Sequence, residues 1–300
     1  MSHITREKLK KILDFNENHD RQVENCLAEF EHRTKLVRGC KGFITYAKAL
    51  LSGEHLEILQ IPLKDKELGA IYYNINSKTY IVLNTSLNLA NNNFALAHEL
   101  FHMYFHHCYE GCTDTERYLI SYHDNEEDLM ANAFAGRFLM PDDSFGQTCH
   151  MALMTYDRSE RINRNGALSE GEKYVSITIY LMIIFETTYM SVVVRLYELG
   201  LLPRDDQMVM ETLLKYNDEK ALRGIIEKVP NLKGSAEKLY HPELVNDFEQ
   251  MYALAKTNGE KSVQSEIMDK GYMEYNLDLL KEMYRKVADV GNEVTQHDIC

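Results

Sequence analysis

Residues 94–107 read FALAHELFHMYFHH and place four histidines and one glutamate within a short stretch. His98 and His102 are four residues apart, so on an α-helix they lie one turn apart on the same face. Two imidazoles in this arrangement match two ligands of one tetrahedral zinc ion. Glu99 follows the first histidine, where it can take a proton from a water molecule as a general base. The stretch therefore predicts a metal-binding helix at about residues 93–106.

The neighbouring histidines and cysteines fit other roles better. His106 is four residues beyond His102, but no glutamate follows His102. We interpret His106 and His107 as the end of the helix, where imidazoles suit the negative pole of the helix dipole. Cys108 and Cys112 have ligand-like spacing, yet no second cysteine pair completes a structural zinc site, so free thiols are favoured.

A catalytic zinc needs a third protein ligand and leaves one position for water. The best source is a second helix predicted at about residues 127–140, which ends before Pro141 because proline disrupts a helix. Asp128, Asn132 and Ala135 share one face of this helix. We predict Asp128 as the third ligand and Asn132 as a neighbour that orients a ligand.

Other third ligands remain open on the sequence alone. Glu127 begins the same helix, where fraying can redirect a side chain, and His123 precedes it. The remaining candidates between the two helices are Asp114, Glu116, Asp124 and Glu126. Manganese or iron also suits two histidines and a carboxylate, but the placement of Glu99 for hydrolysis favours one zinc ion per chain.

The composition limits the classes of function. The 300 residues carry a formal net charge of −13, with 33 lysines and arginines against 46 aspartates and glutamates. Such a chain repels a polyphosphate backbone, so we expect no direct nucleic-acid binding. The N-terminus lacks the pattern of a secretory signal, and the six cysteines are sparse and unevenly spaced. These features indicate a cytoplasmic protein.

The patterns along the chain predict an α+β, mostly helical fold. Residues 55–86 alternate and are rich in isoleucine, tyrosine and valine, which predicts a small antiparallel sheet. We divide the chain into an N-terminal helical segment at 1–40, a domain at 41–202 that carries the metal site, and an acidic, all-helical C-terminal domain at 203–300. The C-terminal helices are a candidate surface for oligomerisation or substrate recognition.

One apolar run is long enough to suggest a membrane span. Residues 174–194 read YVSITIYLMIIFETTYMSVVV. Glu186 lies near the centre of the run, beside two threonines, and the flanks lack the residues typical of a span. We predict two short buried helices with a turn at ETT, within a helix-turn-helix-like segment at about 174–200, and no membrane association.

Three ordered blocks of sequence resemble the ImmA/IrrE family of zinc metallopeptidases. They are FALAHELFH, then DLMANAFAGRFLMP, then FETTYMSVVVRLYELGLL, and the resemblance covers roughly residues 40–202. Asp128 stands where the family usually carries a glutamate ligand, while Ala95 and Phe101 replace a threonine and a glycine. We expect Phe101 to narrow the cleft at the metal.

The resemblance implies a zincin-like metallopeptidase core and a function. We expect an intracellular, zinc-dependent endopeptidase that cleaves a helix-turn-helix transcriptional repressor and so derepresses mobile-element or stress-response genes. The oxyanion donor stays open among Tyr104, Tyr122 and His123. The alternative function is a catalytically weak or inactive metal-binding regulator that senses or sequesters a protein partner, because Asp128 departs from the family pattern.

Overall fold

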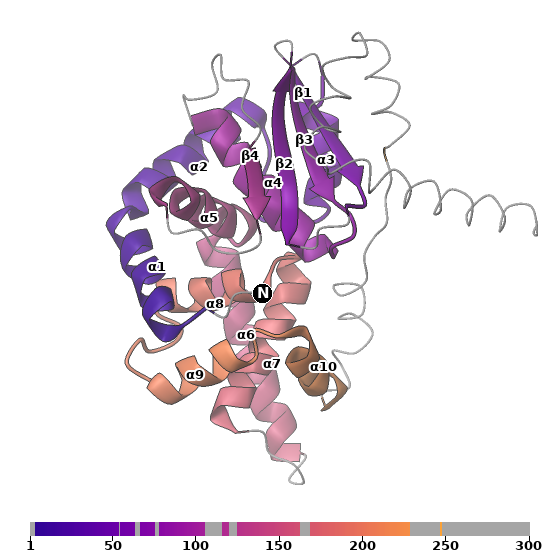
Figure 1. Cartoon of the computed structure of the whole chain (residues 1–300). Helices are drawn as coiled ribbons and strands as arrows, with labels where there is room; N and C mark the ends of the chain where they lie inside the picture. Colours follow the sequence, from indigo (N-terminus) through magenta and orange to yellow (C-terminus); the bar gives the residue numbers. More distant parts are fainter. Residues whose placement is uncertain are drawn as a thin grey trace, which may run out of the picture.

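The structure is a computed structural model of the chain, and it describes residues 4–53, 55–63, 67–75, 78–105, 116–119, 125–162, 169–228 and 247. Within these ranges, ten helices accompany one four-stranded sheet (Figure 1). The predicted α+β, mostly helical class is confirmed. The helices are α1 (Arg6–Asn18), α2 (Asp20–Thr34), α3 (Phe43–Leu51), α4 (Leu89–Phe105), α5 (Glu126–Leu139), α6 (Asp142–Ile162), α7 (Glu170–Phe185), α8 (Tyr189–Glu198), α9 (Gln207–Lys215) and α10 (Glu219–Lys228).

The sheet is mixed, so the prediction of an antiparallel sheet is wrong for one strand. The strands are β1 (Leu56–Ile61), β2 (Leu68–Ile75), β3 (Lys78–Asn84) and β4 (Glu116–Leu119), in the spatial order β1-β3-β2-β4. β2 pairs antiparallel with both β3 and β4, whereas β1 pairs parallel with β3. Alternation in a sequence predicts strands and hairpins, but it does not predict which side of a hairpin an earlier strand joins.

Asn84 stabilises the connection between β1 and β2, which leaves β1 parallel to β3. Its side-chain oxygen accepts hydrogen bonds from the amides of Leu63 (2.9 Å) and Ser86 (3.0 Å). Its side-chain nitrogen donates to the carbonyl of Leu68 at 2.7 Å. Asn84 is fully buried, so these bonds satisfy polar groups that water cannot reach. The chain leaving β1 is thereby held at the end of β3 while it passes to β2.

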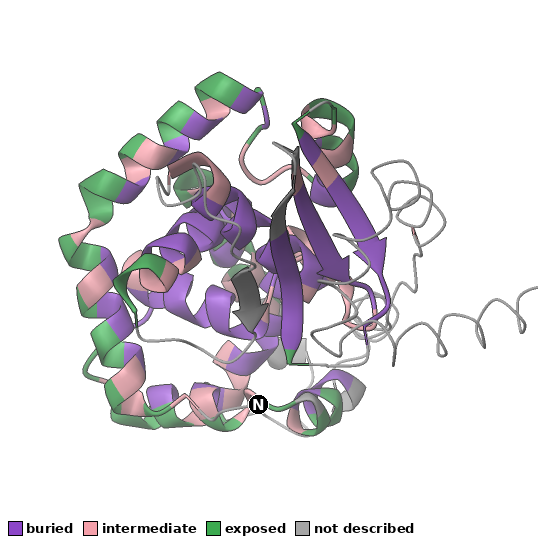
Figure 2. Ribbon diagram, turned by 45° about the horizontal axis from the view of Figure 1, so that its top comes forward, coloured by how far each residue is buried: buried purple, intermediate pink, exposed green. Residues whose placement is uncertain are grey.

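Two apolar clusters make up the interior. One joins α1 to helices α6–α10, and the other joins α2, α3, the sheet, α4 and α5. Figure 2 shows the helices with their buried residues facing inward, beside a sheet whose described residues are mostly buried. The predicted domain boundaries near residues 40 and 202 stay predictions.

An aromatic group fixes the two helices that carry the predicted site. Phe30 of α2 is fully buried and meets the rings of Phe134 and Phe138 of α5 edge-on, with both ring centroids 5.3 Å away. It also meets Tyr104 of α4 at 5.1 Å in the same geometry. Edge-to-face contacts of this kind are favourable beyond the area that they bury. α2 therefore sets the position of α5 against α4.

The apolar run at 174–194 folds as two helices, as predicted. α7 ends at Phe185, Glu186 adopts a left-handed conformation with φ of 48°, and α8 begins at Tyr189. No single described helix has the length and apolar composition of a membrane span. α7 and α8 reach those criteria only when taken together, and they are bent by 107°.

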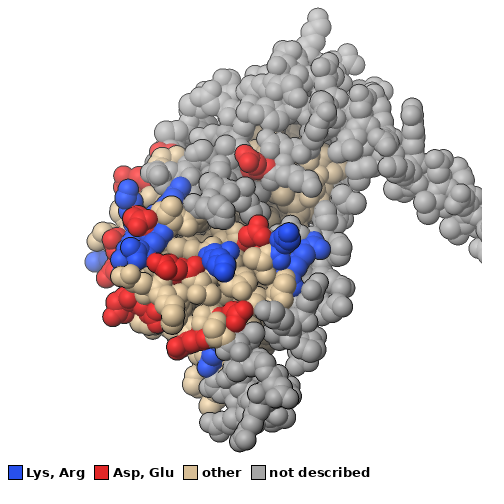
Figure 3. All heavy atoms as spheres, turned by 60° about the horizontal axis from the view of Figure 1, so that its bottom comes forward, with Lys and Arg blue, Asp and Glu red and all other residues tan. Residues whose placement is uncertain are grey.

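Charges of both signs lie side by side on the described surface in Figure 3. Arg6 of α1 bonds to Gln207 of α9 at 2.9 Å, and Arg204 pairs with Glu17 at 2.6 Å. Of the predicted helical region at 203–300, the structure describes residues 203–228, which contain α9 and α10, and Asp247. The rest of that prediction lies outside the described residues.

Two glycines near the start of α3 provide a matched test of this packing. Gly39 and Gly42 both have positive φ, 67° and 69°, which strains any residue with a Cβ atom. A Cβ at Gly39 would lie 2.9 Å from Cδ of Pro141, whereas a Cβ at Gly42 would meet nothing within 4 Å. We expect Gly42→Ala to lower the free energy of unfolding by about 1 kcal/mol and Gly39→Ala by about 2–3 kcal/mol, measured by urea denaturation. Equal losses would show that Pro141 does not pack against residue 39.

Candidate metal centre

α4 presents the two histidines from a buried position. The side chain of Asn88 accepts a hydrogen bond from the amide of Asn91 at 2.9 Å, which caps the start of the helix. His98 and His102 are 2% and 3% exposed, and their Nε2 atoms lie 3.0 Å apart. Both imidazoles therefore point to one place from successive turns of α4.

α5 presents the carboxylate from its first turn. Asn125 caps this helix, since its side-chain oxygen accepts from the amide of Asp128 at 2.7 Å. Ala131 and Ala135, which share the face of Asp128 and Asn132, are fully buried. Small side chains let two helices approach closely, so the packing of α5 against α4 brings Asp128 up to the histidines.

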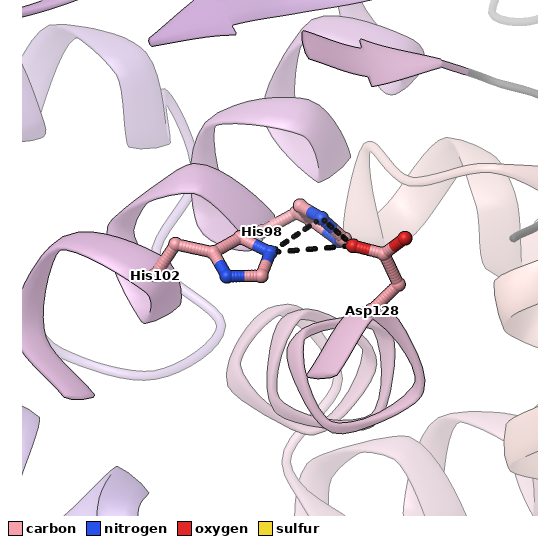
Figure 4. A group of neighbouring side chains, drawn as sticks. All are labelled: His98, His102 and Asp128. Carbon is pink, nitrogen blue, oxygen red and sulfur yellow. Dashed lines mark hydrogen bonds and ion pairs between the residues drawn. The ribbon is translucent and has the colours of Figure 1, made fainter. Parts of the chain in front are cut away.

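The three predicted ligands meet in the structure (Figure 4). Oδ1 of Asp128 lies 3.6 Å from Nε2 of His98 and 3.5 Å from Nε2 of His102. Among the described residues, these three form the one group of side chains placed to hold a metal ion. The prediction placed these same three residues together.

The distances within this group fit zinc. Metal–ligand bonds of about 2.0–2.1 Å in a tetrahedral site separate neighbouring ligand atoms by about 3.3 Å. The three separations here are 3.0, 3.5 and 3.6 Å. The circle through atoms at these distances has a radius of about 2.0 Å, so one ion can reach all three with bonds of normal length.

The protonation states also suit a metal. Burial lowers the pKa of His98 to about 4, and the nearby His102 acts in the same direction against the opposing influence of Asp128. Burial alone would raise the pKa of the Asp128 carboxyl, but its interactions with His102 and His98 outweigh this and hold the pKa well below its usual range. Metals bind neutral imidazole and ionised carboxylate, and the site favours both forms at neutral pH.

Asn132 takes the orienting role that the sequence predicted. Its side-chain oxygen lies 3.1 Å from Nδ1 of His98. Because this oxygen can only accept, Nδ1 of His98 carries the proton and donates it, which leaves the Nε2 lone pair for a metal. α5 thus supplies both a ligand and the group that sets the orientation of a ligand on α4.

Glu99 lies next to His98 on α4 and is 1% exposed. A carboxylate in this position is screened from bulk solvent, so any water that it activates must be bound within the site itself. The role of Glu99 as a base stays a prediction.

Of the alternative ligands whose side chains the structure describes, Glu126 and Glu127, neither belongs to the group. Both are exposed, although Glu127 neighbours Asp128. His106, His107, Cys108, Cys112, Asp114, Tyr122, His123 and Asp124 lie outside the described residues, as does the side chain of Glu116.

Phe101 does not narrow a cleft as we expected from the sequence. It is 5% exposed and belongs to the apolar cluster of the sheet and α4, where its ring contacts Phe105 and Phe134. Because residue 101 is on the side of α4 that packs into the core, the larger side chain fills space between helices.

Asn125 is a residue of the site that the sequence analysis missed. Besides capping α5, its side-chain nitrogen donates to Oδ2 of Asp128 at 2.8 Å. One carboxylate oxygen is thus held by Asn125 while the other faces the histidines. The available signal was an asparagine three residues before the ligand, at the position where helix caps occur.

The fold and this site together define a metallopeptidase-type domain. Residues 54–171 match the family model for the IrrE N-terminal-like domain of the M78 peptidases, a range that includes α4 and α5. Over this range the match is to the ImmA/IrrE family, which the first two blocks of sequence also resemble. The third block of the resemblance, at residues 185–202, lies beyond the matched range. A search of curated proteins returns no match to the chain.

Zinc titration tests the three-residue group. We expect wild-type protein to bind one zinc ion, and Asp128→Ala or His102→Ala to weaken binding by at least a hundredfold, because each removes one of three ligands. Calorimetry in competition with a chelator measures these affinities. Glu127→Gln is the matched control: it removes an adjacent but exposed carboxylate and should bind zinc as wild type does. Loss of zinc binding in Glu127→Gln would indicate that Glu127 is the third ligand in place of Asp128.

The role of Asn125 can be separated from simple capping. Glycine at a cap position costs only a few tenths of a kcal/mol, so Asn125→Gly should leave stability nearly unchanged while weakening zinc about tenfold through loss of the bond to Asp128. Asn125→Ser should restore affinity, because Ser169 in the equivalent position of α7 donates to Glu172 at 3.0 Å. Wild-type zinc affinity in Asn125→Gly would show that Asn125 only caps α5 and does not support the ligand.

Proposed function

We propose that this protein is a zinc-dependent endopeptidase that cleaves a specific regulatory protein in the cytoplasm. The observation that carries the proposal is the convergence of two buried imidazoles and one carboxylate at zinc-ligand spacing. The metallopeptidase-type domain at residues 54–171 supports the same reaction class. Three protein ligands leave a coordination position for water, as catalytic zinc sites require.

The proposed mechanism assigns each residue a role. His98, His102 and Asp128 would hold zinc, which supplies polarisation of the scissile carbonyl and a lowered pKa for water when bound. Glu99 takes the proton from the attacking water and passes it to the leaving amine. Asn132 holds His98 in the tautomer that presents Nε2, and Asn125 holds the carboxylate of Asp128.

We propose a helix-turn-helix transcriptional repressor as the substrate, so that cleavage derepresses mobile-element or stress-response genes. The support is the similarity to the ImmA/IrrE family over residues 54–171 together with the sequence blocks described above. The protein would act on the repressor itself and not on DNA, since its net charge of −13 opposes nucleic-acid binding. The C-terminal helices are the proposed region for recognition or oligomerisation.

Glu99→Gln tests catalysis separately from binding. The change keeps the size of the side chain and all three metal ligands but removes the base, so we expect normal zinc content and proteolysis reduced by at least about a hundredfold. New protein N-termini generated in cells that express wild type, and absent with Glu99→Gln, would identify the substrate. Glu127→Gln should give the wild-type set of N-termini.

The same variant decides the alternative function. A regulator that works by binding alone would keep its effect on gene expression when Glu99 is replaced. Full derepression by Glu99→Gln, with no new N-termini in either strain, would therefore contradict the peptidase and favour the metal-binding regulator. The specific observation behind that alternative is the aspartate ligand, which is one methylene shorter than the usual glutamate.

A further inference from the structure

The outer edge of β1 has unusual backbone partners. β1 is the first strand of the sheet and pairs only with β3 among the described strands. The carbonyls of His55 and Ile61 accept from Thr79 (2.8 Å) and Thr85 (3.0 Å), so they face β3 and the residues that follow it. Because backbone groups alternate in direction along a strand, the amide and carbonyl of Gln60 face away from β3. This is where another strand would pair.

Asp247 satisfies both of these backbone groups. Its amide donates to the carbonyl of Gln60 at 2.8 Å, and its Oδ2 accepts from the amide of Gln60 at 2.9 Å. Lys48 of α3 donates to the same Oδ2 at 2.6 Å. The side chains of Lys48 and Asp247 are 30% and 18% exposed, so water screens this pair only in part. Asp247 thus occupies the backbone positions at Gln60 where another strand would pair, and it adds a charge-assisted bond to Lys48.

The position of Asp247 is informative because of where the chain comes from. α10 ends at Lys228 and packs against α7 in the cluster that contains α1 and α6–α9. Figure 1 shows α10 in the lower half of the molecule and β1 in the upper half. Asp247 therefore lies against a strand of a different apolar cluster from the one that contains α10.

We propose that Asp247 anchors the chain at residue 247 to the outer edge of β1 and closes this edge at Gln60 to strand addition by a second copy. An unpaired strand edge is a template for pairing with another chain, and proteins block such edges with charges or with other segments. The partner that fits this surface is a residue that offers both a carboxylate and a backbone amide, and Asp247 of the same chain offers both. The proposal does not depend on the metal site.

Amide hydrogen exchange of full-length protein tests the anchor. Asp247→Ala should raise the exchange rate of the Gln60 amide at least about tenfold, because that amide loses a charged acceptor. Asp247→Asn keeps a side-chain oxygen, and Lys48→Met keeps the aspartate, so each should give a smaller rise. Lys41→Met removes an exposed lysine just before α3 and should leave the rate unchanged. An unchanged exchange rate of the Gln60 amide in Asp247→Ala would show that Asp247 does not anchor the chain at this edge.

Sedimentation of the same variants tests the closing of the edge. Asp247→Ala should associate as its concentration rises, whereas wild type and Lys41→Met should not change their state over that range. Faster exchange of Gln60 with no change in association would overturn the part of the proposal that concerns a second copy. If Asp247→Ala does not fold, both measurements are made on Lys48→Met. A wild-type exchange rate of the Gln60 amide and wild-type association in Lys48→Met would then contradict the proposal.

Discussion

The close approach of α4 and α5 is the constraint on which the rest of the site depends. Oδ1 of Asp128 can lie 3.5 and 3.6 Å from the two Nε2 atoms only because alanines occupy the interface between the helices. An aspartate is shorter than the glutamate usual in the family, so it needs this short interhelical distance. The ring of Phe30 on α2 packs against both helices, through Tyr104 of α4 and Phe134 of α5. The position of α2 therefore affects the geometry of the site.

Burial dominates the pKa of His98, whereas the interactions with the two histidines dominate the pKa of Asp128. The almost completely buried imidazole of His98 therefore favours its neutral form, and the carboxylate of Asp128 favours its ionised form. The position of Asp128 in the first turn of α5 adds the favourable field of a helix N-terminus. Asn125 and Asn132 then fix one carboxylate oxygen and one imidazole tautomer. The result is a site whose resting protonation already suits a divalent cation.

The sequence predicted what depends on spacing along a helix. His98, His102, Asp128 and Asn132 were found in this way, and the break between α7 and α8 was found from Glu186 and two threonines within an apolar run. The parallel pairing of β1 was not predictable, because it depends on which edge of the β2–β3 hairpin receives an earlier strand. Phe101 was misplaced because a motif alone does not say which side of a helix faces the core. No local pattern links Asp247 to Gln60, which lies 187 residues earlier.

X-ray absorption at the zinc edge of the metal-loaded protein tests the central claim most directly. The account predicts a first shell of nitrogen and oxygen only, at about 2.0–2.1 Å, with the scattering signature of two imidazoles. A sulfur shell at about 2.3 Å would contradict it, because zinc would then bind the cysteines at 108 and 112 and not the carboxylate of Asp128. A shell with three imidazoles would contradict it as well, by placing a histidine in the position assigned to Asp128.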